Sequence, residues 1–173
     1  MSATAAAKSA ATRMRFNFPR KQVRIDAPMG FGTGQLGRLL LIRDSVSALV
    51  AKERLEFNDR PVAVNTQQYS ELLLHKATLL GPDNPAMRDL AFFWLENQQL
   101  VRKMFDELVP RLAGSSKPYT RLHRVGSAGL QVLEIRDNQL PPLVPRVEPG
   151  VRSQYLINYL LKCAREDPDF KPV

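Results

Sequence analysis

Bulky apolar residues recur every three or four positions between residues 85 and 110. This spacing predicts amphipathic helices, because positions three and four apart share one helix face. Asn84 and Pro85 fit the cap and the first position of the first helix, and residues 96–99 bend or break the run into two helices. Pro110 is expected to end the second of them. The core is predicted to include Phe93, Trp94, Phe105 and Leu108.

The pattern changes to a period of two after this helical region. Residues 119–125 and 130–135 alternate apolar and polar side chains on either side of a Gly-Ser-Ala-Gly turn at residues 126–129. Alternation on both sides of a glycine-containing turn is typical of a β-hairpin. The two helices can pack their apolar faces against one face of the hairpin, which predicts a two-layer core.

The chain before residue 85 predicts two more helices and a short strand. A helix over residues 36–54 has an apolar stripe, and residues 55–59 can form a strand that turns at Asn58-Asp59. A second helix over residues 67–80 can be capped by Asn65 or Thr66. The stripe of the first helix contains Leu36, Leu39, Leu40, Val46, Leu49 and Val50, and the inward residues of the second are Tyr69, Leu72, Leu73 and Leu80.

These elements predict an α/β protein of the α+β kind, with about four helices on a small mixed or antiparallel sheet. Four prolines within residues 141–149 exclude regular structure there and indicate an extended strap. Residues 151–164 resume helical spacing, and the partner of this helix can be the core or another protein. We expect a basic N-terminal extension at 1–29, a globular core at 30–137, and a strap with a C-terminal helix at 138–173.

The net charge of +8 and the pI near 10.0 indicate an anionic partner, either nucleic acid or a membrane surface. Residues 1–60 carry 11 basic and 5 acidic side chains, whereas residues 61–113 carry 5 and 6. The helical middle is therefore neutral, and the positive charge belongs to the N-terminal third and the hairpin region. The single cysteine, Cys163, excludes an intramolecular disulfide and a zinc cluster of cysteines, and its place on an apolar helix face predicts a packed thiol. No apolar run approaches the ~18 residues of a spanning helix, so no membrane insertion is expected.

The first 29 residues are rich in Ala, Ser and Arg and contain no acid before Asp26. This composition is typical of a mitochondrial import segment. A disordered basic tail and a basic arm that becomes ordered on RNA fit the same composition. The candidate RNA-binding cations of this region are Arg13, Arg15, Arg20, Lys21 and Arg24.

Gly32-Thr-Gly34-Gln-Leu-Gly37 matches the spacing of the dinucleotide-binding fingerprint. That motif requires a buried apolar strand directly before the first glycine, and residues 24–29 contain two charges and a proline instead. A flexible connection into the next helix explains the glycines better. A nucleotide-cofactor-binding enzyme that uses this loop remains the alternative function.

No catalytic group of residues is evident, and no metal or cofactor site is expected. His75 is predicted to be a surface or half-buried residue. His123 lies between Arg121 and Arg124, where stacking or phosphate contact fits better than catalysis. These three residues form an aromatic and basic cluster with Tyr119, Lys117 and Arg111. Such a cluster can bind RNA, because cations contact phosphates and planar groups stack on unpaired bases.

Three stretches resemble ribosomal large-subunit protein seventeen of the bacterial type. They are Arg38 to Glu53, Met104 to Arg111 with its Leu-Val-Pro-Arg ending, and Tyr119-Thr120-Arg121. Phe93-Trp94-Leu95 and Leu140-Pro141-Pro142-Leu143 are similar to the mitochondrial branch of that family. The chain departs from the family pattern at Ala51-Lys52, where a basic pair is usual, and at Lys117-Pro118, where Gly-Gly is usual.

The resemblance implies a structural protein of the large subunit that lies on ribosomal RNA near the nascent-chain exit, beside other large-subunit proteins. It implies a mitochondrial ribosome in the matrix, and neither enzymatic activity nor a small-molecule substrate. We expect one continuous positive RNA-binding surface on the folded domain. Its candidate residues are Arg38, Arg43, Lys52, Arg54, Arg111, Lys117, Tyr119, Arg121 and Arg124.

Overall fold

The computed structural model describes residues 14–19, 25, 34–115, 117–125, 129–143 and 154–166. The chain divides into two compact units, Met1–Asn138 and Gln139–Val173. The described elements of the first unit are α2 (Gly34–Lys52), β1 (Arg54–Phe57), α3 (Arg60–Leu80), α4 (Pro85–Trp94), α5 (Gln98–Lys103), the π-helical turn η1 (Met104–Leu108), α6 (Val109–Ala113), β2 (Thr120–Val125) and β3 (Leu130–Ile135). The second unit contains α8 (Leu156–Glu166).

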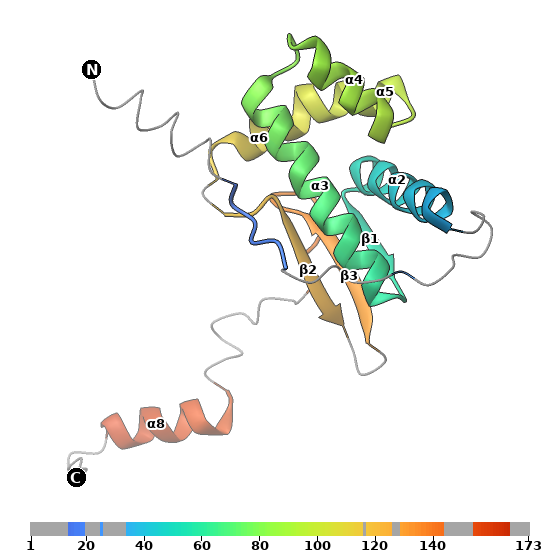
Figure 1. Ribbon diagram of the computed structural model, residues 1–173. Helices are drawn as coiled ribbons and strands as arrows, with labels where there is room; N and C mark the ends of the chain where they lie inside the picture. The colour runs from blue at the N-terminus through green and yellow to red at the C-terminus, as the bar shows by residue number, and fades with distance from the viewer. Residues whose placement is uncertain are drawn as a thin grey trace, which may run out of the picture. The chain divides into compact units, whose positions relative to one another are not determined.

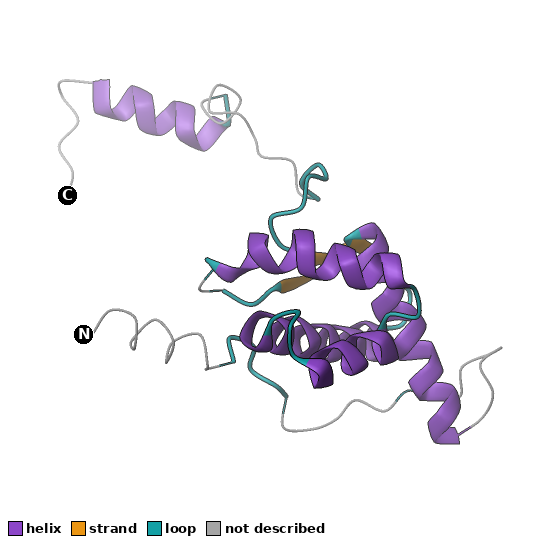
Figure 2. Ribbon diagram, turned by 90° about the horizontal axis from the view of Figure 1, so that it is seen from above, coloured by secondary structure: helices purple, strands orange, loops and turns teal. Residues whose placement is uncertain are grey.

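The sheet has three strands in the order β1-β3-β2, and both pairings are antiparallel. This confirms the predicted α+β fold and the hairpin, whose turn residues 126–128 lie outside the described residues. Leu55 and Leu122 both pair with Leu133, so the three side chains share one face of the sheet. Helix α3 lies along the sheet and contacts all three strands, as Figure 1 shows, and Figure 2 shows how much of the first unit is helical.

Helix α2 confirms the first predicted helix, although it ends two residues earlier than predicted. Its buried apolar side chains, Ile42, Val46, Leu49 and Val50, begin in the third turn. Leu36 is 67% exposed, so the predicted apolar stripe is wrong in the first turn. Residues 34–37 of the glycine-rich stretch belong to the helix itself, and Gly30 and Gly32 lie outside the described residues.

Helix α3 begins at Arg60, seven residues before the predicted start. Asp59 has the extended backbone of a cap residue, and Pro61 occupies the first turn, where its missing N–H costs nothing. Asn65 and Thr66 do not cap the helix. Their side chains lie inside it and donate to the carbonyl oxygens of residues 61 and 62, each at 2.8 Å. Leu80, which was expected to point inward, is 48% exposed at the helix end.

The predicted break between the third and fourth helices is confirmed. The Asn84 side chain accepts the Ala86 N–H at 3.0 Å at the start of α4, and Asn97 accepts the Gln99 N–H at 2.9 Å at the start of α5. Both asparagines satisfy backbone donors that a helix start leaves unpaired.

Pro110 does not end the fourth helix, contrary to the prediction. The chain widens into the π-helical turn η1, in which the N–H of Val109 reaches the carbonyl of Met104, five residues back. Pro110 then occupies the first turn of α6, which continues to Ala113. A proline disrupts a regular helix because it lacks an N–H and crowds the carbonyl four residues back. The wider turn before it changes that geometry.

Trp94 and Leu108 are buried in the core, as predicted, but two other predicted core residues are not. Phe93 is 44% exposed, and Phe105 is half-buried at the core edge. Successive helix residues are rotated by about 100°. Trp94 therefore shares the inward face of α4 with Met87 and Ala91, and Phe93 points away from it.

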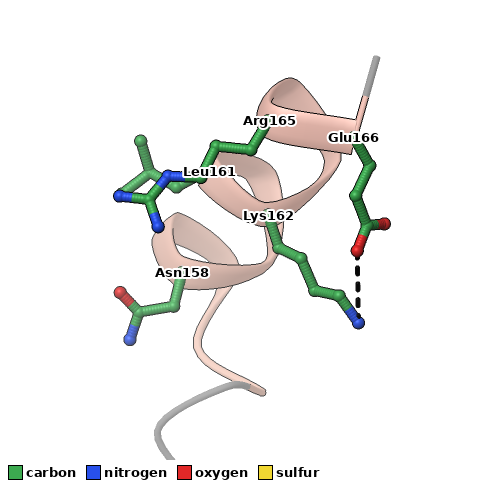
Figure 3. Close-up of a pocket in the computed structure, with 5 residues that line it drawn as sticks. All are labelled: Asn158, Leu161, Lys162, Arg165 and Glu166. Carbon is green, nitrogen blue, oxygen red and sulfur yellow. Dashed lines mark ion pairs between the residues drawn. The ribbon is translucent and has the colours of Figure 1, made fainter. Parts of the chain in front are cut away.

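Helix α8 of the second unit overlaps the predicted C-terminal helix at 151–164 and ends two residues later than predicted. None of its residues is buried, and the expectation that Cys163 is a packed thiol is wrong because its side chain is exposed. Figure 3 shows its polar side, where Lys162 and Glu166 form an ion pair at 3.8 Å beside Asn158 and Arg165. Within the described residues, every helix is too short or too polar to span a membrane.

Candidate nucleic-acid interface

Five of the predicted RNA-binding cations project from the first unit into solvent. They are Arg38 and Lys52 on α2, Lys117 before β2, and Arg121 and Arg124 on β2. Within the described part of the chain, no acidic side chain forms an ion pair with any of them. Their charges are therefore available to an external anion.

Three other predicted cations are held by acids of the protein itself. Arg54 pairs with Glu134 at 3.1 Å. Arg111 pairs with Glu53 at 2.7 Å. Arg43 lies 3.4 Å from the carboxylate of Glu96, and its guanidinium lies 5.3 Å from the centre of the Phe93 ring. These side chains are half-buried, so part of their charge is already compensated inside the protein.

Glu53 joins three elements at the end of α2. Its backbone has a positive φ of 62°, which stops the helix, and its carboxylate binds both Arg111 of α6 and Lys103 of α5. Lys103 also donates to the carbonyl oxygen of Ala51 at 2.9 Å. A positive φ is unfavourable for a residue with a side chain, and these contacts stabilise it. We conclude that Arg111 stabilises the packing of α2 against α5 and α6.

Glu134 is the centre of a second ion-pair group on the sheet. Its carboxylate binds Arg54 and the Nε2 of His123, the latter at 3.0 Å. Burial alone would raise the pKa of Glu134, but the hydrogen bonds from His123 and Arg54 outweigh burial, and the pKa is lowered. His123, which was expected to stack on a base or contact phosphate, is thus engaged with a neighbouring strand.

Tyr119 is buried, and the half-buried Arg15 lies against its ring. The Tyr119 side chain is 1% exposed, so its ring cannot stack on an external base in this conformation. The Arg15 guanidinium lies 5.2 Å from the centre of that ring. It also donates to the carbonyl oxygens of Leu112 and Ala113 at 3.4 and 3.3 Å. Carbonyl groups at a helix C-terminus attract a cation, so Arg15 attaches the N-terminal segment to the end of α6.

Among the described residues of the N-terminal extension, one is buried. Ile25 is 8% exposed and belongs to the hydrophobic core, so the extension supplies apolar as well as basic contacts. The other candidate cations, Arg13, Arg20, Lys21 and Arg24, lie outside the described residues.

Glu71 of α3 positions the start of β2, and the sequence analysis missed it. Its Oε2 accepts the Tyr119 N–H at 3.1 Å, and its Oε1 accepts the N–H and the hydroxyl of Thr120, both at 2.6 Å. Burial raises the pKa of Glu71, and the hydrogen bonds from Thr120 and Tyr119 offset part of that effect. We call these three hydrogen bonds the Glu71 clamp. They fix the backbone directly before Arg121, which is the first exposed residue of β2. The signal in the sequence is an isolated acid within an apolar helical stretch.

His75 is buried beside this clamp, which corrects the expectation of a surface or half-buried residue. It is 6% exposed, and its ring centre lies 6.4 Å from that of Tyr119. Across the described ranges, no group of three or more His, Cys, Asp or Glu side chains could hold a metal ion.

Arg60 is a second residue that the sequence analysis missed. It is exposed at the first position of α3 and lines a surface hollow with Arg124. The sequence contains the necessary signal, because Asp59 followed by Pro61 two positions later is a typical helix start. The helix start was missed because Asn58-Asp59 was interpreted as a turn.

The fold and these surfaces define a small basic α+β protein whose exposed cations are presented on a scaffold of internal ion pairs. Residues 41–132, from α2 to β3, match the family described as Ribosomal protein L17, and the chain belongs to this family. It is similar to the large ribosomal subunit protein bL17 of Thermomicrobium roseum, with 29% identity over 96 residues that cover 56% of this chain and 79% of the relative. The predicted resemblance to the bacterial-type family is confirmed. The family is structural and not enzymatic, so the alternative of a nucleotide-cofactor enzyme is set aside.

Proposed function

We propose that this chain is a structural constituent of the large ribosomal subunit and binds ribosomal RNA through its exposed cations. The observation that carries the proposal is the division of its basic residues. Arg43, Arg54 and Arg111 are paired with acids, whereas Arg38, Lys52, Lys117, Arg121 and Arg124 project without an acidic partner among the described residues. Exposed unpaired cations can neutralise phosphates and release their counterions.

We further propose that the ribosome in question is mitochondrial and that the protein lies near the nascent-chain exit, beside other large-subunit proteins. The Arg-rich composition of residues 1–29, with no acid before Asp26, supports import into the matrix. The Phe93-Trp94-Leu95 and Leu140-Pro141-Pro142-Leu143 motifs support the mitochondrial branch. Sedimentation of the protein with large subunits, tested separately on mitochondrial and cytosolic fractions, distinguishes the two locations. Cross-linking to ribosome-bound nascent chains tests the position at the exit.

Arg38→Gln and Arg121→Gln are each expected to weaken RNA binding and to lower its salt dependence. If each side chain neutralises one phosphate, each substitution should reduce the slope of log affinity against log salt by about 0.7–0.9. The loss should be similar for different RNA sequences, because phosphate contacts carry no sequence information. Binding titrations at several salt concentrations measure both quantities. Arg102→Gln on α5, an exposed cation that is not among the proposed RNA-binding residues, is the charge-matched control. Unchanged affinity and slope in the first two variants would contradict the proposed surface.

Arg111→Gln should act mainly on stability. It removes a 2.7 Å charged hydrogen bond to Glu53 that joins α2 to α6. Hydrogen bonds to charged groups contribute about 1.5–3 kcal/mol, and solvent screening of this half-buried pair reduces the expected loss to about 1–2 kcal/mol. Urea unfolding measures the loss, with Arg102→Gln as the control. A large change in salt slope with unchanged stability would instead place Arg111 on the RNA.

A further inference from the structure

Arg60 and Arg124 line the same surface hollow of about 440 Å³, although they lie in different elements. Arg60 is the first residue of α3, and Arg124 is near the end of β2. Leu122, Gly129 and Gln131 are the other described residues that line it. The hollow is therefore formed where the start of α3 approaches the hairpin.

The described residues that line the hollow include two arginines and no acid, so the hollow is positively charged. Arg60 and Arg124 are both exposed, and neither forms an ion pair with an acid of the described ranges. Asp59 precedes Arg60 but does not line the hollow. Because both arginines line one hollow, their positive charges repel each other, and a bound anion would remove that repulsion.

The hairpin side of the hollow is shaped by Gly129. Its φ is +79°, and a Cβ at this position would lie 3.9 Å from an Nη atom of Arg124, so the guanidinium lies against the turn. The side-chain amide of Gln131 donates to the Gly129 carbonyl at 2.8 Å and fixes the base of the turn. The first turn of α3 adds partial positive charge from the helix dipole. Arg124 is thus held on β2, which pairs with β3 at this position through Arg124 and Gln131.

We propose that this hollow binds one backbone phosphate of RNA between the Arg60 and Arg124 guanidinium groups. The ligand class follows from the groups present, because the planar N–H donors of arginine match phosphate oxygens bidentately. The inference rests on the proposed RNA-binding function and extends it to a defined site. It assigns Arg60 a role that no other observation on this chain gives it.

The test compares full-length wild-type protein with Arg60→Gln, Arg124→Gln and the double variant in binding to a fragment of large-subunit ribosomal RNA. Each single substitution should weaken binding about tenfold or more, the size expected for a charged hydrogen bond. Since both arginines hold the same phosphate, the double variant should lose less than the product of the two single losses. Its salt slope should fall by about 0.7–0.9, the value for one phosphate. Arg102→Gln should leave binding unchanged.

Three outcomes would overturn the inference. Wild-type affinity in the double variant would show that the hollow does not bind RNA. The proposed function would still stand if Arg38→Gln lowered the salt slope of RNA binding. Losses that multiply, with a slope change twice as large, would show two separate phosphate contacts. Absence of RNA binding by the wild-type protein would overturn both the site and the proposed function. Arg60→Lys and Arg124→Lys, which keep the charge but lose the planar fork, should retain the wild-type slope with weaker affinity, and they remain usable if a Gln variant misfolds.

Discussion

Trp94→Ala should destabilise the folded protein by about 3–5 kcal/mol, the usual cost of removing a buried large aromatic side chain. Trp94 is 8% exposed, and its ring centre lies 4.9 Å from that of Tyr69 on α3. A domain of this size has only about 5–15 kcal/mol of stability in total, so the loss should be visible as a large shift of the urea midpoint.

The neighbouring residue provides a matched control for this prediction. Phe93 is also aromatic and lies on the same helix, but it is 44% exposed. Its ring is nearly perpendicular to that of Trp94, at a centroid distance of 5.5 Å. Phe93→Ala should therefore cost about 1 kcal/mol, close to the value of an aromatic pair. An equal or larger effect of Phe93→Ala in the same unfolding experiment would mean that the inward face of α4 is wrongly assigned.

Glu71→Gln is expected to cost about 1–3 kcal/mol at neutral pH, because it leaves a buried donor without an acceptor. The glutamine oxygen can still accept the hydrogen bonds of Thr120. Its NH₂ group, however, would face the Tyr119 N–H, which now donates to the second carboxylate oxygen at 3.1 Å. Glu107→Gln, at an exposed position of η1, is the control and should stay within about 0.5 kcal/mol of wild type. Equal stability of the Glu71 and Glu107 variants would contradict the clamp.

The stability difference between wild type and Glu71→Gln is expected to depend on pH. The folded-state pKa of Glu71 is raised above its usual value of 4.5, so the folded protein holds this proton more strongly than the unfolded chain does. The stabilising contribution of protonation is fully present below the unfolded pKa and is lost as the pH rises through the folded pKa. The stability advantage of wild type over Glu71→Gln should therefore decrease as the pH rises above 4.5. An advantage that grows over this interval would show that the three hydrogen bonds outweigh burial.

Most of the secondary structure could be predicted because it depends on local spacing. The hairpin, the Asn84 cap and the break before α5 follow from residues within a few positions of each other. The errors arose where local signals compete. The segment before Pro61 fits a turn as well as a helix start, and Pro110 predicts a helix end unless the preceding turn widens.

The candidate site was less predictable, because it depends on which charges meet. Arg111 and Glu53 are 58 residues apart, and Arg54 and Glu134 are 80 apart. A composition or a local motif contains no information on such distances. Arginines that pair internally are indistinguishable in the sequence from arginines that project, and so Arg43, Arg54 and Arg111 were grouped with Arg38 and Arg121.

The sequence by itself determined the α+β class, the basic character of the chain and its family, because periodicity, charge and short motifs are properties of the linear chain. The tertiary structure decided the environment of each charged or aromatic group. In the folded chain, Tyr119 is buried against Arg15, and Glu71 is buried against the start of β2. Arg60 and Arg124 line one hollow. Burial and ion pairing depend on the distances between segments remote in sequence, and only the folded chain sets those distances.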